Sequence, residues 1–182
     1  GMTQGLFATL IIGTMIQQIG LLIGGSTGNV IYLLGKAAAA LTSAGIGVGV
    51  AVKYGESPLV TVSAAVAAMV GGYAGKITGG TFFVDGNAVL AGPGEPLGAF
   101  IAAFAGITCG HLVSGKTKVD IIVTPVITIG AGSVVGLLVG PPISQMMTGL
   151  GSIINWATEQ RPFIMGIVVS VVMGMVLTLP IS

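Results

Sequence analysis

The sequence predicts an all-α integral membrane protein, a polytopic helical bundle of about six spans with re-entrant or interfacial segments. Hydrophobic residues make up 53% of the 182 residues and charged residues only 6%, against about 25% charged in soluble domains. The mean hydropathy is +1.06. The run "IIVTPVITIGAGSVVGLLVG" is apolar at both alternating positions, whereas outer-membrane strands alternate apolar and polar residues. Helices are therefore favoured over a barrel.

The apolar runs set the expected spans, because about 20 apolar residues cross a hydrocarbon core of about 30 Å. Polar "GGSTGN" is expected to break the chain after the first span, and "GKITGGTFFVDGNAVLAGPGEP" to form a long loop after the third. A weaker run, 143–156, follows "GPP" and is expected to be re-entrant or interfacial. The six expected spans are residues 6–23, 37–52, 58–74, 97–113, 119–139 and 162–179.

These spans form one expected transmembrane domain, residues 2–182, or the N-terminal half of a larger one. Gly1 precedes Met2 and is interpreted as a remnant of an expression tag. Pairs of small residues four apart recur on the spans, and such pairs are typical of close helix packing in membranes. The pairs are Gly20/Gly24, Gly45/Gly49, Gly71/Gly75, Gly106/Gly110, Gly136/Gly140 and Gly166/Ser170/Gly174.

Polar residues of two stretches are the first candidates for substrate binding. "SIINWATEQRPFIMG" holds Asn155, Trp156 and Glu159, and "GPGEPLG" holds Glu95. Carboxylates and amides hydrogen-bond hydroxyl groups, and an aromatic face packs against a sugar ring. Two other interpretations stay open: the prolines after the glutamates start ordinary helices, and tryptophan prefers the membrane interface.

Four further residues are second candidates. Ser26, Thr27 and Asn29 lie in "GGSTGN", which either ends a helix or exposes backbone groups to a ligand, as the broken helices of transporters do. His111 lies near a span boundary and is either a polar helix end or a proton relay.

Other functions are disfavoured by the sequence. "GHLVSGKT", residues 110–117, matches the phosphate-loop template, but that motif needs a preceding strand, and here a run of membrane-span length precedes it. We interpret it as a helix end. Cys109 and His111 point to different faces of a helix, and the sequence has no second Cys or His, so no metal site, cofactor or catalytic residue is expected. A net charge of +1 disfavours nucleic-acid binding.

Several long strings resemble the membrane (IIC) component of the bacterial phosphotransferase system, and within it the perfringolysin-O-regulator-like branch. They are "KTKVDIIVTPVITI", "VGPPI", "MTGLG…INWATE" and "MGMVLTLPIS". The resemblance is strongest from about residue 94 to residue 182, and this chain would correspond to roughly the family's N-terminal half.

The resemblance implies a multi-pass homodimer in the bacterial cytoplasmic (inner) membrane, with a carbohydrate pocket that contains a Glu-Pro element. Glu95–Pro96 has this order, whereas two residues separate Glu159 from Pro162. It also implies cytosolic IIA and IIB proteins as partners. The chain has no phosphorylatable module of its own, so it is not expected to act as an enzyme by itself.

The leading hypothesis is therefore a permease component that binds and translocates a small polar solute, a carbohydrate. A membrane sensor or regulator that binds a ligand or partner without transport is the first alternative. An ion-coupled secondary transporter is the second, with Glu95, Asp120 and His111 as its titratable groups.

Overall fold

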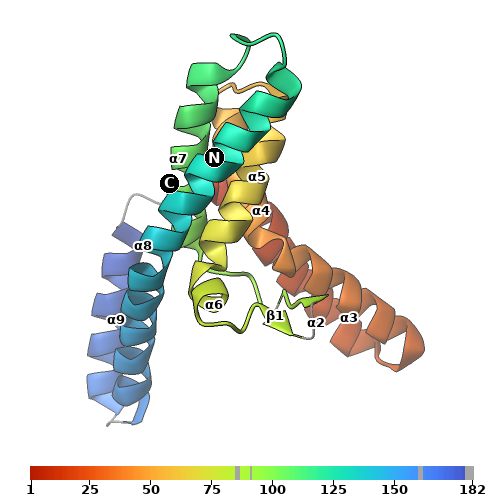
Figure 1. Cartoon of the computed structure of the whole chain (residues 1–182). Coiled ribbons are helices and arrows are strands. Elements are labelled where there is room, and N and C mark those ends of the chain that lie inside the picture. The colour runs from red at the N-terminus through yellow and green to blue at the C-terminus, as the bar shows by residue number, and fades with distance from the viewer. Residues whose placement is uncertain (85–86, 91, 160–161, 179–182) are drawn as a thin grey trace. The chain divides into compact units, whose positions relative to one another are not determined.

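The computed structural model describes residues 1–84, 87–90, 92–159 and 162–178, without the side chains of 157–159, 162–164, 172–173 and 176–178. The chain forms two compact units, Gly1–Pro141 and Pro142–Ser182. The first unit contains the helix packing that positions the candidate site (Figure 1).

The chain begins with helical segments that run almost without interruption and then turn back on themselves. They are α1 (Met2–Leu6), the π-helical segment η1 (Phe7–Ile11), α2 (Ile12–Ile23) and α3 (Gly25–Ala40). Gly24 and Gly25 both have φ +65°, a conformation that glycine adopts without steric cost. They make the turn that lets α3 pack antiparallel on α2, with Gly20 against Gly28 and Gly13 against Gly35.

The expected break at "GGSTGN" after the first span is present, but it is confined to Gly24, and the following residues form the first turns of α3. The second span, expected over 37–52, contains a helix bend. The chain bends by 51° between α3 and α4 (Thr42–Lys53), where the Thr42 hydroxyl donates to the carbonyl of Ala39 at 2.6 Å.

Helices α4, α5 and α7 pack together as the core of the first unit (Figure 1). Proline occupies the first turn of both α5 and α7, where its fixed φ favours a helix start and its missing N–H costs nothing. The expected loop after α5 contains a short helix and a two-stranded antiparallel hairpin. The elements are α5 (Pro58–Gly72), α6 (Ala74–Thr78), β1 (Phe83–Val84), β2 (Asn87–Ala88) and α7 (Pro96–Val113).

The core is built from small side chains, as the glycine pairs predict. A Cβ placed on Gly71 would lie 2.5 Å from the carbonyl oxygen of Gly98, and one on Gly106 would lie 2.6 Å from that of Thr128. Neither distance is tolerable, so these helices touch backbone to backbone. Close packing is thus confirmed at Gly71 and Gly106, which belong to two of the predicted pairs.

The last two helices are α8 (Asp120–Glu159) and α9 (Pro162–Thr178). Helix α8, which is 40 residues long, continues through Pro141 and Pro142, so "GPP" does not end a helix, and the end of the fifth span near residue 139 stays a prediction. Proline is tolerated inside membrane helices because neighbouring groups satisfy the freed carbonyls. Residues 143–156, expected to be re-entrant or interfacial, are the second half of this helix.

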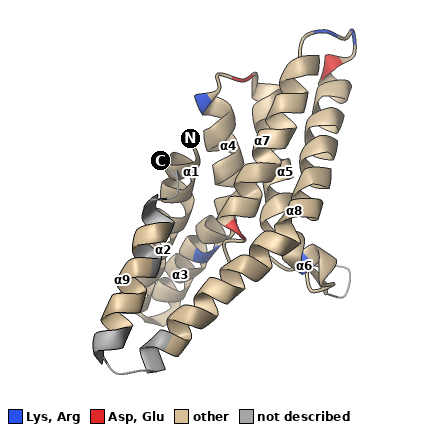
Figure 2. Cartoon of the chain, turned by 90° about the vertical axis from the view of Figure 1, so that its left-hand side faces the viewer, with Lys and Arg blue, Asp and Glu red and all other residues tan. Residues whose placement is uncertain are grey.

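Length and composition make three described stretches able to cross a membrane: Met2–Ile23, Pro96–Val113 and Asp120–Trp156, with the bent α3–α4 pair as a fourth. Helix α5 has only 15 residues. Most charged residues drawn lie in loops or at helix ends (Figure 2). The predicted all-α membrane fold is confirmed, and the number of six spans stays a prediction.

Candidate functional site

The antiparallel pair α5 and α7 carries a carboxylate at each end. Glu56 precedes the Ser57–Pro58 start of α5, and Glu95 directly precedes the Pro96 start of α7. The start of α5 lies beside the end of α7, because Gly110 packs near Val60, and the end of α5 lies beside the start of α7, because Gly71 packs on Gly98. Each carboxylate is thus placed where one helix begins and the other ends.

At the Glu95 end, a buried tyrosine joins three interruptions of the helices. Tyr73 lies between α5 and α6 and is only 1% exposed. Its hydroxyl hydrogen-bonds to the carbonyl of Gly92, in the loop before α7, and lies 3.2 Å from the carbonyl oxygen of Ala40 at the end of α3. One phenol therefore ties together the α3–α4 bend, the α5–α6 break and the loop that carries Glu95.

The loop before α7 has further backbone anchors. The Ser43 hydroxyl donates to the carbonyl of Pro93 at 3.0 Å, and the Glu95 N–H donates to the carbonyl of Gly72 at 2.7 Å. Gly94 has φ +76°, and a Cβ there would meet the Ser43 Oγ at 2.5 Å. Only glycine fits this position, so the loop is held closely against α4 and the end of α5. Glu95 is the half-buried N-cap of α7 and forms no side-chain capping bond.

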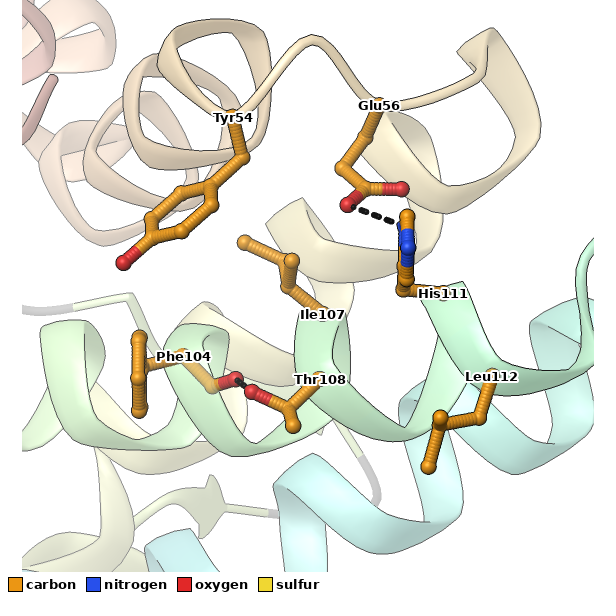
Figure 3. Close-up of a pocket in the computed structure, with 7 residues that line it drawn as sticks. All are labelled: Tyr54, Glu56, Phe104, Ile107, Thr108, His111 and Leu112. Atoms are coloured by element: carbon orange, nitrogen blue, oxygen red, sulfur yellow. Dashed lines mark hydrogen bonds and ion pairs between the residues drawn. The ribbon is translucent and has the colours of Figure 1, made fainter.

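At the Glu56 end, the same helix pair borders a hollow of about 240 Å³ (Figure 3). The Glu56 side chain is only 7% exposed, and its Oε1 lies 2.9 Å from Nδ1 of His111, which is 72% exposed. The contact joins the α4–α5 loop to the last turn of α7. The hollow is lined by Tyr54, Glu56, Phe104, Ile107, Thr108, His111 and Leu112.

The rest of the hollow is largely aromatic and apolar. The rings of Tyr54 and Phe104 lie 6.0 Å apart with a tilt of 59°. The Thr108 hydroxyl donates to the carbonyl of Phe104 at 2.8 Å and keeps its acceptor capacity. A carboxylate, an imidazole and a hydroxyl thus share one hollow with two aromatic rings.

Sequence reasoning found His111 and missed its partner Glu56. The available signal was the stretch "YGESP", in which a glutamate shortly precedes a proline, as it does in "GPGEP". Because a proline near a helix start fixes where the preceding side chain lies, this repeated pattern could have identified both carboxylates.

The remaining predicted residues lie elsewhere. Ser26, Thr27 and Asn29 are exposed in the first turns of α3. Asn155 and Trp156 are exposed on α8 in the second unit. Glu159 ends α8, and its side chain lies outside the described residues. Glu95 belongs to the first unit, so a single site made of Glu95, Asn155, Trp156 and Glu159 stays a prediction.

The stretch that matches the phosphate-loop template is a helix end. Helix α7, not a strand, precedes it, and Gly115 has φ +76°. The N–H of Gly115 donates to Oδ1 of Asp120 at 3.0 Å, and the Thr124 hydroxyl donates to the same oxygen at 2.6 Å. The loop is therefore closed by its own carboxylate. Across the described ranges, no three His, Cys, Asp or Glu side chains gather as metal ligands would.

A protein-family model with the description "Phosphotransferase system, EIIC" matches residues 1–182, the whole chain. Comparison with curated proteins gave no match, and neither did comparison with solved structures. The family match extends to the first 93 residues, where the sequence itself offered only spacing and "GGSTGN". The long apolar helices agree with a membrane protein of this kind. The chain belongs to the EIIC family of the phosphotransferase system.

Proposed function

We propose that this chain is the permease component of a phosphotransferase system, which binds a carbohydrate and moves it across the bacterial cytoplasmic membrane. Cytosolic IIB and IIA proteins would supply the phosphoryl group, and two copies of the chain would form the working dimer. Family membership supports this class of function. The observation that supports a site in this chain is the junction of helix interruptions at Glu95.

The junction offers the polar groups that a sugar needs. Broken helices in transporters present free backbone groups and helix ends to a solute. Here the carboxyl ends of α3 and α5 and the amino end of α7 meet around the loop at Glu95. Sugar hydroxyls both donate and accept hydrogen bonds, so a site with a carboxylate and opposite helix ends suits them.

The other predicted residues are proposed in two groups. Asn155, Trp156 and Glu159 would contribute an amide, an aromatic face and a second carboxylate to the solute path. Ser26, Thr27 and Asn29 are weaker candidates, because they lie exposed at the tip of the α2–α3 hairpin.

Uptake and binding by the purified chain test this proposal. The chain is reconstituted in liposomes, and flux is measured for labelled glucose, mannitol, N-acetylglucosamine and cellobiose. For the transported sugar, Glu95→Gln is expected to lower flux about tenfold or more, since hydrogen bonds to a charged group contribute about 1.5–3 kcal/mol. The matched control is Lys118→Gln, which changes an exposed charge in the α7–α8 loop.

The other outcomes of the flux and binding measurements distinguish the proposal from its alternatives. Unchanged flux in Glu95→Gln would overturn the role of Glu95. Saturable binding with no flux would favour the sensor or regulator, and flux that depends on a sodium or proton gradient would favour the ion-coupled transporter. If no sugar binds or raises the melting temperature, the substrate class is wrong.

A further inference from the structure

We infer that the hollow at Glu56 and His111 is a second solute site, at the opposite end of the α5–α7 pair from Glu95, and that it takes a neutral, hydroxyl-bearing solute. This inference rests on the proposed transport function for its role and on the geometry of the hollow for its chemistry.

The two ends of α7 are separated by roughly the thickness of a membrane. Glu95 precedes the helix and His111 lies in its last turn. At a rise of about 1.5 Å per residue, the intervening 16 steps place them about 24 Å apart along the axis. The hydrocarbon core is about 30 Å thick. Because α7 is long and apolar enough to cross a membrane, Glu95 and the hollow at His111 lie at opposite ends of a helix of membrane-spanning length.

The Glu56 carboxylate is placed to accept hydrogen bonds from a ligand. Burying a carboxylate is costly unless it is paired, and His111 pairs with Oε1 at 2.9 Å. Within the part of the chain that the structure describes, Oε2 has no hydrogen-bond or ion-pair partner. Since Glu56 is 7% exposed and lines the hollow, a ligand there would complete the pairing of this carboxylate.

The other groups of the hollow define the class of ligand. The second ring nitrogen of His111 and the Thr108 hydroxyl add hydrogen-bonding capacity next to the faces of Tyr54 and Phe104. Hydroxyl groups over an aromatic ring match this combination. His111 already pairs with Glu56, so a neutral solute needs no displacement of a side chain, whereas an ammonium ion would compete with the imidazole. The volume, about 240 Å³, suits one sugar ring rather than a long oligosaccharide.

A purely structural role for the pair makes different predictions. The contact also ties the α4–α5 loop to the end of α7, and a second tie exists between the hydroxyls of Ser57 and Ser114 at 3.3 Å. Ser114→Ala removes that tie without changing a residue that lines the hollow. It is therefore the matched control for a loss of stability alone.

Equilibrium binding in lipid nanodiscs tests the site. The probes are labelled glucose, mannitol, N-acetylglucosamine and cellobiose, and ethylamine is the cationic probe. Each probe is applied to the full chain and to Glu95→Gln. We expect sugar binding to persist in Glu95→Gln. When Glu56→Gln is added to Glu95→Gln, the Kd for the sugar is expected to rise about tenfold. When Ser114→Ala is added instead, the Kd is expected to stay within about twofold of that of Glu95→Gln alone. His111→Gln keeps a donor beside Glu56 and is expected to lose less than His111→Ala.

Transport from each membrane face separates this inference from the proposed function. In oriented liposomes, Glu56→Gln is expected to raise KM for flux that starts at the Glu56 end and to leave KM from the other end unchanged. If Glu56→Gln has a lower melting temperature but binds sugar and transports it normally, the Glu56–His111 pair has only a structural role. That result would overturn the inference, even if Glu95→Gln abolishes flux.

Tighter binding of ethylamine than of any sugar would overturn the ligand class. Sugar binding at Glu56 with no effect of Glu95→Gln on flux would contradict the proposed function and leave the inferred site standing.

Discussion

Among single residues, Tyr73 does the most to fix the loop that carries Glu95. Its ring is buried, and its hydroxyl reaches two backbone carbonyls, those of Gly92 and Ala40, which lie far from it in the sequence. A typical intramolecular hydrogen bond contributes about 0.5–1.5 kcal/mol to stability, so the loss of both contacts has a cost of about 1–3 kcal/mol.

Tyr73→Phe is therefore expected to lower the free energy of unfolding by about 1–3 kcal/mol and to raise KM for the transported sugar more than it lowers kcat. The ring still fills its space, so the fold is retained. The measurements are thermal melting in detergent and flux in liposomes. Tyr32→Phe, on α3 and outside both proposed sites, is the control for removing a phenol. An unchanged KM in Tyr73→Phe would show that the phenol stabilises the fold without positioning Glu95.

The sequence allowed some of these residues to be identified and not others. Glu95 was predictable because it directly precedes a proline, and Glu56 was missed although "YGESP" has a related pattern. The partners of Tyr73 depend on tertiary contacts across 19 and 33 positions. No local pattern reports such contacts, so the anchoring of the Glu95 loop could not be predicted.

Among the helices, the α5–α7–α8 packing depends on glycines that leave no room for a side chain. A Cβ on Gly71 would lie 2.5 Å from the carbonyl oxygen of Gly98, and one on Gly136 would lie 2.8 Å from the Cα of Gly71. Membrane helices gain their association energy from such close contact.

Gly71→Ala is expected to destabilise the protein by about 1–3 kcal/mol, because an added methyl group would force these helices apart. Gly130→Ala makes the same substitution on an exposed face of α8, where nothing lies within 4 Å of the added Cβ. It is expected to have no such cost and serves as the matched control. Equal melting temperatures for the two variants would contradict the close packing at Gly71.

Helix boundaries were predicted well where proline starts a helix and where Gly24 ends α2, and poorly at "GPP". Pro58 and Pro162 begin helices as expected. The "GPP" stretch continues α8, and "GGSTGN" yields to α3 after Gly24. In a bilayer, backbone groups have no water to bond to and stay helical. Glycine and proline, which often end helices in soluble proteins, are therefore weaker predictors of a helix end in a membrane protein.

For the whole molecule, composition was enough to predict a membrane protein, because so few charged residues leave no surface suited to water. Long apolar runs without alternation then predicted helices rather than a barrel. The number of spans was harder to predict. It depends on where helices bend, as at Leu41, and on how much of a long helix lies in the bilayer. Neither property follows from local hydropathy.

Helix α8 gives the last prediction, because it is longer than a membrane is thick. Its Asp120–Trp156 stretch of 37 residues would extend about 55 Å against a core of about 30 Å. The first half packs on α7 through Gly132 and Ala102, so we expect it to occupy the bilayer and residues after about 145 to leave the hydrocarbon region. In a Cys109→Ser background, Val134→Cys is expected to resist a membrane-impermeant maleimide, whereas Ile153→Cys is expected to react, with labelling after denaturation as the control. Protection of both thiols would show that the second half of α8 is also shielded from water.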